Sequence, residues 1–120
     1  MKKQLLALAI TAIATSGAFA QATDTLAKLK DSGKISLGVR DSSALSFTLG
    51  NGKYVGFHTE MAERIVDDLN KATGKTLAIT YTPVTSQNRI PLVQNGTVDL
   101  ECGSTTNNMV RQKDVAFAVT

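Results

Sequence analysis

Hydrophobic and polar residues alternate in three separate stretches of the chain, and this alternation predicts three β-strands. The stretches are residues 35–39, residues 77–81 just before Pro83, and residues 98–102. A period of two sends successive side chains to opposite faces of a sheet. Between the first two strands, Gly50-Asn51-Gly52 divides residues 45–57, which predicts a hairpin because Gly and Asn tolerate the positive φ of tight turns.

A stripe of apolar residues at helical spacing predicts one long helix between the hairpin and the second strand. Thr59 is the expected N-cap, Glu60 and Glu63 are expected in its first turn, and Gly74 is the expected stop. The stripe consists of Met61, Ala62, Ile65, Val66, Leu69 and Ala72.

Three shorter helical segments are predicted elsewhere. Residues 25–30 precede a turn at Asp31-Ser32-Gly33, and a second helix runs from about Ile90, with Pro91 in its first turn, to Asn95-Gly96. Residues 108–113 suggest one more helical turn, and residues 116–119 an extended piece. The order of elements is that of an α/β fold with a mainly parallel sheet flanked by helices.

Polar loops follow each of the three predicted parallel strands. They span residues 38–43, 85–89 and 103–108, and they are rich in hydroxyls, amides or arginine. Because the carboxyl ends of parallel strands meet at one edge, where such sheets hold ligands, we expect the three loops to converge there.

Three arginines accompany these loops, and they point to an anionic ligand. Arg40 and Arg89 lie within the loops, and Arg111 follows shortly after the third. One carboxylate rarely needs three guanidinium groups, so a dicarboxylate is the economical inference. A phosphate is the rival, but the chain lacks a G-x-x-x-x-G-K-[ST] loop. The structural alternatives are solvated arginines, with Ser104 and Thr106 acting only as helix caps.

The N-terminus has the pattern of a secretory signal peptide over residues 1–20. Lys2 and Lys3 precede an apolar run, and Ala18-Phe19-Ala20 supplies small residues for cleavage. The mature chain is expected to begin near Gln21, in a bacterial periplasm. Without the two lysines, the 13 basic and 10 acidic residues become 11 and 10. With no basic run, nucleic-acid binding is not expected.

Catalytic and metal chemistry have little support in the sequence. Cys102 is the single cysteine and His58 the single histidine, so neither a disulfide nor a metal site is expected, and no cofactor is implied. Cys102 is expected to be a small buried strand residue, and His58, just before the long helix, to be a surface or N-terminal-turn residue. Asp99 and Glu101 could share a strand face as a general acid and base, but the simpler interpretation places them at the entry and border of the strand.

Several longer stretches resemble a known family. Gly56-Phe57-His58-Thr59-Glu60-Met61 resembles the signature of the type-3 extracellular solute-binding proteins, which serve ABC importers of polar amino acids, although His58 replaces a usually acidic residue. Residues 85–97 and 101–117 closely resemble the glutamate/aspartate-binding branch. The resemblance covers residues 25–120.

The resemblance implies a role for each candidate residue. Arg111 and Thr106 would hold the α-carboxylate of glutamate or aspartate, and Ser104 would contact the ammonium group. Arg40, Ser86 and Arg89 would bind the side-chain carboxylate. The implied partners are the membrane subunits of an ABC permease, and the protein is expected to be a monomer and not an enzyme.

The family fold has two lobes that close on the ligand about a hinge. Residues 21–120 would form part of the first lobe of this periplasmic-binding-protein-like fold, which implies a truncated chain without the second lobe. Two alternatives stay open at this point: a dehydratase on the same fold, and the ligand-sensing module of a larger receptor or wall-degrading enzyme.

Overall fold

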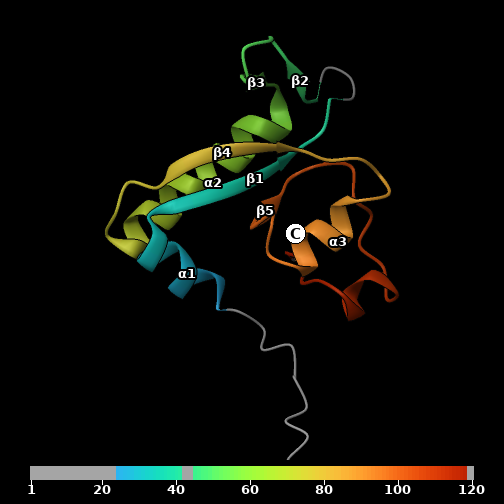
Figure 1. The fold of residues 1–120 in the computed structure, drawn as a ribbon. Helices are drawn as coiled ribbons and strands as arrows, with labels where there is room; N and C mark the ends of the chain where they lie inside the picture. Colours follow the sequence, from blue (N-terminus) through green and yellow to red (C-terminus); the bar gives the residue numbers. More distant parts are fainter. Residues whose placement is uncertain (1–23, 42–44, 119–120) are drawn as a thin grey trace, which may run out of the picture.

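The central element of the fold is a three-stranded parallel sheet in the order β4-β1-β5 (Figure 1). The computed structural model describes residues 24–41 and 45–118. β1 (Lys34–Val39) pairs with β4 (Ala78–Pro83) from Lys34↔Ala78 to Val39↔Pro83. On its other side it pairs with β5 (Leu100–Glu101). The predicted α/β fold with a parallel sheet is therefore confirmed.

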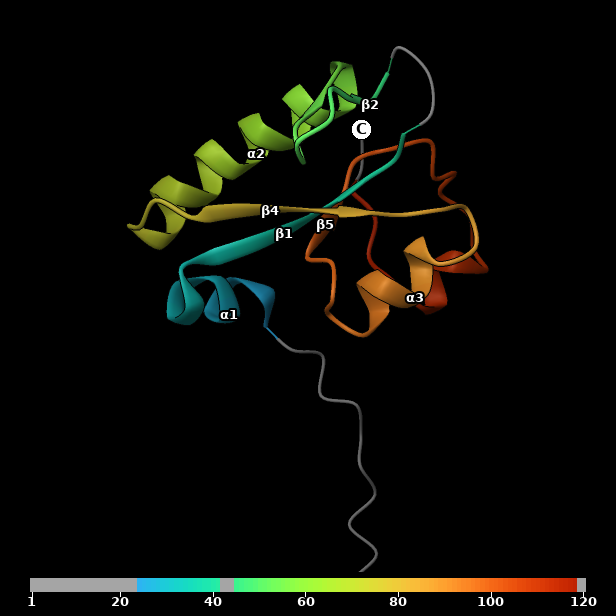
Figure 2. The same ribbon diagram turned by 45° about the horizontal axis from the view of Figure 1, so that its top comes forward.

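Helices lie on both sides of this sheet. α2 (Phe57–Thr73) runs along one side and α3 (Arg89–Gln94) lies on the other (Figure 2). α1 (Thr25–Ser32) precedes β1, and the 3-10 turn η1 (Arg111–Lys113) follows β5. The predicted hairpin is present as β2 (Phe47–Thr48) and β3 (Tyr54–Val55), which are antiparallel.

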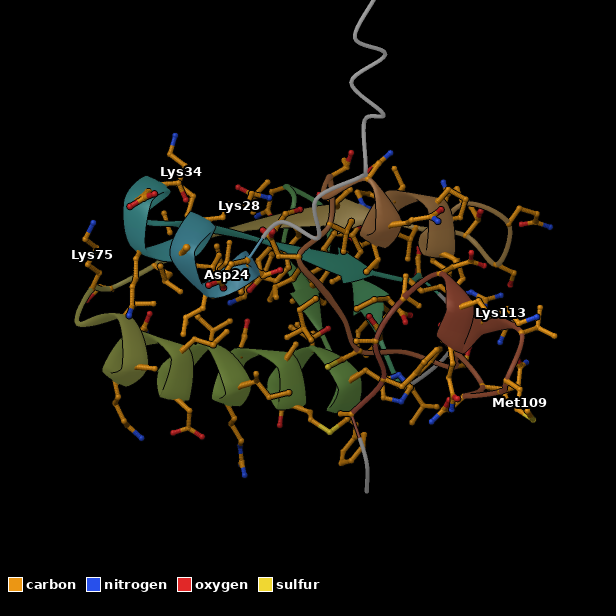
Figure 3. The ribbon with its side chains drawn as sticks, turned by 90° about the horizontal axis from the view of Figure 1, so that it is seen from below. Asp24, Lys28, Lys34, Lys75, Met109 and Lys113 are labelled. Atoms are coloured by element: carbon orange, nitrogen blue, oxygen red, sulfur yellow. The ribbon has the colours of Figure 1, made fainter. Side chains whose placement is uncertain are left out.

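The strands run from one end of the molecule to the other, which sets where the polar loops lie. Lys34 begins β1, and Lys75 lies shortly before β4 at the same end. Met109 and Lys113, which follow the last strand, lie at the opposite end (Figure 3). Among residues 24–41 and 45–118, no helix has the length and hydropathy to cross a membrane.

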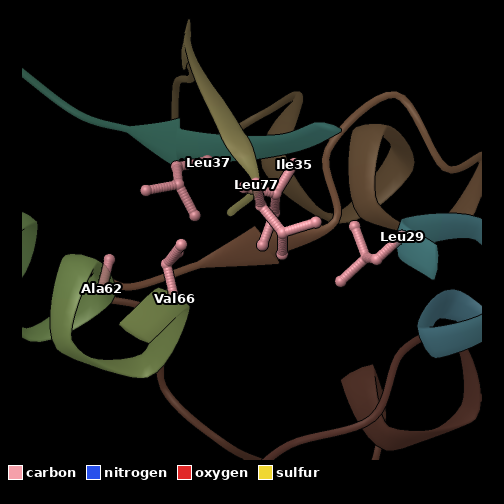
Figure 4. Packing of buried hydrophobic residues seen from close by; sticks show 6 residues of the cluster. All are labelled: Leu29, Ile35, Leu37, Ala62, Val66 and Leu77. Atoms are coloured by element: carbon pink, nitrogen blue, oxygen red, sulfur yellow. The ribbon is translucent and has the colours of Figure 1, made fainter. Parts of the chain in front are cut away.

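The hydrophobic core fills the space between α2, α1 and one face of the sheet. Leu37, in the middle of β1, is fully buried, and Val66 of α2 and Leu29 of α1 pack into the same cluster (Figure 4). Its buried members are Leu29, Ile35, Leu37, Ala62, Val66 and Leu77. α1 is also held by an ion pair from Lys28 Nζ to Asp99 Oδ1, 2.6 Å long, beside β5.

The start of α2 differs from the prediction. The helix begins two residues before Thr59, at Phe57, so Thr59 is not its N-cap. Instead, Thr59 is buried and shares a hydrogen bond of 3.3 Å with Ser46, next to the hairpin. Gly56 precedes the helix with φ 117°, and a Cβ there would lie 2.7 Å from the Leu45 carbonyl oxygen. The close approach of the Leu45 backbone therefore requires glycine at this position, and the Gly56 carbonyl accepts from the Glu60 N–H over 2.9 Å at the start of the helix.

Three further predictions need correction. Glu63 is not in the first turn of α2, where the acidic residue is Glu60. The third strand is limited to Leu100–Glu101: the backbone N–H of Val98 donates to the Leu92 carbonyl of α3, although the Asp99 N–H still donates to the Ser36 carbonyl of β1. Residues 116–118 form no strand, and Val119 lies outside the described residues. The predicted signal peptide and its cleavage site near Ala20 also lie outside them.

Candidate functional site

The loop after β1 and the loop after β5 meet directly, as the sequence predicts. Arg40 follows the last residue of β1 and is half-buried. Its Nη1 donates to Oγ of Ser104, in the loop after β5, over 3.0 Å. These contacts place a guanidinium and an exposed hydroxyl side by side at the carboxyl edge of the sheet.

Arg111 lies beyond the same loop and turns back toward it. It is the first residue of η1, and its Nη1 donates to the Thr106 backbone carbonyl over 2.9 Å. The Asn108 side chain accepts from the backbone N–H groups of Val110 and Arg111 and so caps the turn. Because Asn108 has this role, Ser104 and Thr106 are not the caps of η1.

Arg89 has a different environment from the other two arginines. It is the first residue of α3, and only 5% of its surface is exposed. Its Nη1 lies 3.9 Å from Oε1 of Glu101 at the end of β5. The alternative of a solvated loop arginine is therefore wrong for Arg89.

Ser86 lies in the loop between β4 and α3 and is exposed. The loop is shaped by its neighbours: the Thr85 N–H donates to the Asn88 side chain over 2.7 Å, and the Asn88 N–H donates back to the Thr85 hydroxyl over 3.2 Å. The structure gives no hydrogen bond from Ser86 to the other described residues. Ser86 lies at the predicted carboxyl edge of the sheet, but it makes no hydrogen bond to Arg40 or Arg89.

The two carboxylates of the third strand segment do not face each other. Asp99 accepts from Lys28 and, over 2.9 Å, from the Ser36 backbone N–H. Glu101 instead faces Arg89 and accepts from the Thr105 hydroxyl over 2.7 Å. With separate cationic partners, they do not form the general acid and base pair that the sequence left open.

The remaining titratable candidates are also accounted for by the fold. Cys102 follows β5 rather than lying in the strand and is half-buried, not buried, against the core; burial, followed by the charge of Glu101, raises the pKa of its thiol. His58 lies in the first turn of α2, as expected, and its backbone N–H donates to the Leu45 carbonyl. Within the part of the chain that the structure describes, no three His, Cys, Asp or Glu residues are placed to hold a metal ion.

Sequence analysis missed the role of Glu101 at this edge. The residues around Glu101 in the sequence do not reveal this role. Its neighbours Leu100 and Cys102 would be apolar whether Glu101 lay at the strand border or faced Arg89. The useful signal is tertiary, since Glu101 lies opposite Gly38 of β1 in the sheet register.

Comparison with known proteins gives a consistent result. The model of the family described as bacterial extracellular solute-binding proteins, family 3, matches residues 35–120. An L-glutamate/L-aspartate-binding protein of Pseudomonas aeruginosa is 50% identical over 100 residues, which cover 81% of this chain and 33% of that protein. A glutamate/aspartate import solute-binding protein of Escherichia coli is 46% identical over 123 residues, covering 95% of this chain and 41% of the relative. The chain thus spans about a third to two fifths of the length of these relatives.

Solved structures show the same fold. A solute receptor for L-cysteine from Neisseria gonorrhoeae has a TM-score of 0.67 at 29% identity, covering 78% of this chain and 37% of that one. An ancestral amino acid-binding protein, described as a precursor of cyclohexadienyl dehydratase, has a TM-score of 0.64 at 27% identity, covering 74% and 37%. Both structures contain this arrangement as part of a longer chain.

Proposed function

The chain belongs to the bacterial extracellular solute-binding proteins of family 3, and from this premise we propose that it is the part of a glutamate- and aspartate-binding protein that recognises the acidic ligand. The observation that carries the proposal is the placement of Arg40, Arg89 and Arg111 at the carboxyl edge of one parallel sheet. Guanidinium groups bind carboxylates through paired, charge-assisted hydrogen bonds, and a dicarboxylate uses several of them.

Each candidate residue has a role in this proposal. Arg111, with Thr106, binds the ligand α-carboxylate, and Ser104 contacts the ammonium group. Arg40, Ser86 and Arg89 bind the side-chain carboxylate. The contact of Arg40 with Ser104 supports a common site for the two ends of a small ligand.

The charge of this edge supports an acidic rather than a neutral ligand. A neutral amide would leave the half-buried guanidinium of Arg40, whose partner Ser104 is neutral, without an opposite charge, and that penalty separates glutamate from glutamine. The relatives agree in trend: the glutamate/aspartate-binding proteins are 41% to 50% identical to this chain, whereas two glutamine-binding relatives are 36% and 37% identical.

The proposal extends to the whole protein and its location. After cleavage near Ala20, the mature chain enters the periplasm, and residues 21–120 form part of the first lobe of a monomeric protein. A second lobe completes the contacts to the ligand, and the membrane subunits of an ABC permease accept it. The names of the relatives, which include an import solute-binding protein and an ABC transporter protein, support this partner.

A dehydratase is the second candidate because one structural neighbour is described as a precursor of such an enzyme. The described residues give it less support. Asp99 and Glu101 are each engaged with a cation, and the relatives with 36% identity or more are named as binding proteins.

Substitution of Arg89 by alanine tests the proposed ligand. Hydrogen bonds to charged groups contribute about 1.5–3 kcal/mol, so R89A in the full-length protein should weaken L-glutamate binding about ten- to a hundredfold in calorimetric titration. L-Glutamine binding should change much less. The matched control is Arg64→Ala, which removes an exposed arginine of α2 outside this edge. Unchanged affinity of R89A for acidic amino acids would refute the assignment.

A further inference from the structure

Glu101 occupies a space that two glycines leave open. It is the last residue of β5, and its side chain is 9% exposed. A Cβ on Gly38, its partner in β1, would lie 3.2 Å from the Glu101 Cγ, and a Cβ on Gly103 would lie 2.1 Å from Oε1. The Thr105 hydroxyl holds the other carboxylate oxygen over 2.7 Å. The two glycines therefore leave room for the Glu101 side chain, and Thr105 fixes the position of its carboxylate.

The carboxylate faces Arg89 without forming a hydrogen bond to it. The closest approach of the pair is 3.9 Å, between Nη1 and Oε1. The buried Nε and Nη1 of Arg89 and the buried Oε1 of Glu101 have no hydrogen-bond partner among the described residues. Buried polar atoms are nearly always paired, so each exception calls for an explanation.

The charge and the hydrogen bonds of Arg89 are thus satisfied by different means. A buried guanidinium is stable only beside an opposite charge, and Glu101 supplies that charge across the 3.9 Å separation. The two unpaired donors, Nε and Nη1, are both buried and lie on different edges of the guanidinium, so the charge of Glu101 is what compensates their burial.

We propose that Glu101 is a positioning residue for Arg89. It keeps the guanidinium buried and oriented at the sheet edge before a ligand arrives, because it supplies the opposite charge without a hydrogen bond that would tie the guanidinium down. The identity of that ligand rests on the proposed function, whereas the positioning of Arg89 does not. Glu101 then determines ligand specificity through Arg89, without touching the ligand.

The direct test follows the Arg89 Nε–H by NMR in the 120-residue chain, without any ligand. Glu101→Gln keeps the shape of the side chain but removes its charge, so Arg89 should move to water and its Nε–H should exchange at least about tenfold faster. Glu101→Asp, which keeps the charge, should restore most of the protection. Glu60→Gln, on an exposed carboxylate of α2, is the control and should leave the exchange unchanged.

Two variants provide the same test if E101Q does not fold. Gly103→Ala should displace the carboxylate, because its Cβ would lie 2.1 Å from Oε1. Thr105→Val removes the hydroxyl that holds Oε2. Faster exchange of the Arg89 Nε–H in either variant is expected, and exchange within about twofold of the wild type in all folded variants would overturn the proposal.

Binding supplies a second measurement that separates the two hypotheses. E101Q should weaken L-glutamate at least about tenfold and L-glutamine little, and it should have no further effect in an R89A background, because a residue that acts through Arg89 is not additive with it. These titrations use the full-length protein with its second lobe: if it binds no glutamate, the proposed function fails, and NMR on the 120-residue chain still decides the role of Glu101. If the effects of E101Q and R89A add, the positioning role is refuted.

Discussion

The three arginines of the sheet edge differ in how strongly the protein holds them. Arg40 and Arg111 are half-buried and donate to neutral oxygens, of Ser104 and Thr106. Arg89 is buried and faces a carboxylate. An arginine held by neutral partners reorients at small cost, whereas a buried one is fixed before binding. Under the proposed function, Arg89 would therefore be fixed before binding, and the other two would adjust to the ligand.

The burial of Arg89 could not be predicted from the sequence. Arg89 and its loop can be recognised in the sequence from residue type and position after a strand. The sequence does not predict that Arg89 pairs with Glu101, because the pairing depends on α3 folding back beside β5. Whether the six candidate residues bind ligand stays a prediction.

Tyr81 gives a prediction of pH dependence at the scale of one residue. Burial, and then its hydrogen bond to the Glu63 carboxylate, raise the pKa of the Tyr81 phenol to about 12. The raised pKa means that the folded state favours the neutral phenol. The associated stability is fully present below the unfolded pKa of about 10 and is lost as the pH rises toward 12. Ultraviolet absorbance of tyrosinate should show this late titration, and it should disappear in Tyr81→Phe.

Tyr81→Phe also tests the link between β4 and α2. The hydrogen bond to Glu63 is half-buried, and bonds of this kind contribute about 1 kcal/mol. The free energy of unfolding in urea should fall by about that amount at neutral pH. An unchanged value would show that the bond to Glu63 does not stabilise the fold.

At the scale of elements, β1 is the segment on which the rest depends. It pairs with β4 and β5, the other two strands of the parallel sheet, and Leu37 at its centre is fully buried. Leu37→Ala should lower the free energy of unfolding by about 2–5 kcal/mol, because truncation of a core leucine leaves a cavity. Leu49→Ala, at a position that is 59% exposed near the hairpin, is the matched control and should change it by less than about 0.5 kcal/mol. Similar losses in urea denaturation would contradict the assignment of the core.

The elements that the sequence predicted are those with strong local signals. Alternation located β1 and β4, and Gly33 and Gly74 end α1 and α2 in the left-handed conformation, as expected. The missed details depend on tertiary contacts. Thr59 has the residue type of a cap, but its hydroxyl bonds to Ser46 beside the hairpin and the helix already begins at Phe57.

The apolar stripe of α2 is only partly buried, and this exposure affects the thermal stability and self-association of the whole chain. Ala62 and Val66 face the core, whereas Met61 and Ile65 are 39% and 38% exposed and Phe57 is 62% exposed. Exposed apolar patches favour association. The chain from Gln21 should therefore melt below about 60 °C, within the mesophile range, and its melting temperature should depend on protein concentration.

Polar substitution of the exposed stripe checks that explanation. Met61→Gln and Ile65→Gln together should reduce light scattering on heating and leave the unfolding transition intact, because neither side chain is part of the buried cluster. A cooperative melt well above about 60 °C for the unaltered chain would show that its exposed surface is not a liability.

The most direct test of the acidic-ligand site uses the relative from Pseudomonas aeruginosa, of which this chain spans 33%. Residues 25–120 would replace the matching segment, and L-glutamate and L-glutamine would be titrated by calorimetry, with R89A as the control. The chimera should bind L-glutamate at least about tenfold more tightly than L-glutamine, and R89A should remove that preference. A folded chimera with equal affinity for both amino acids, or one whose preference survives R89A, would contradict the proposed site.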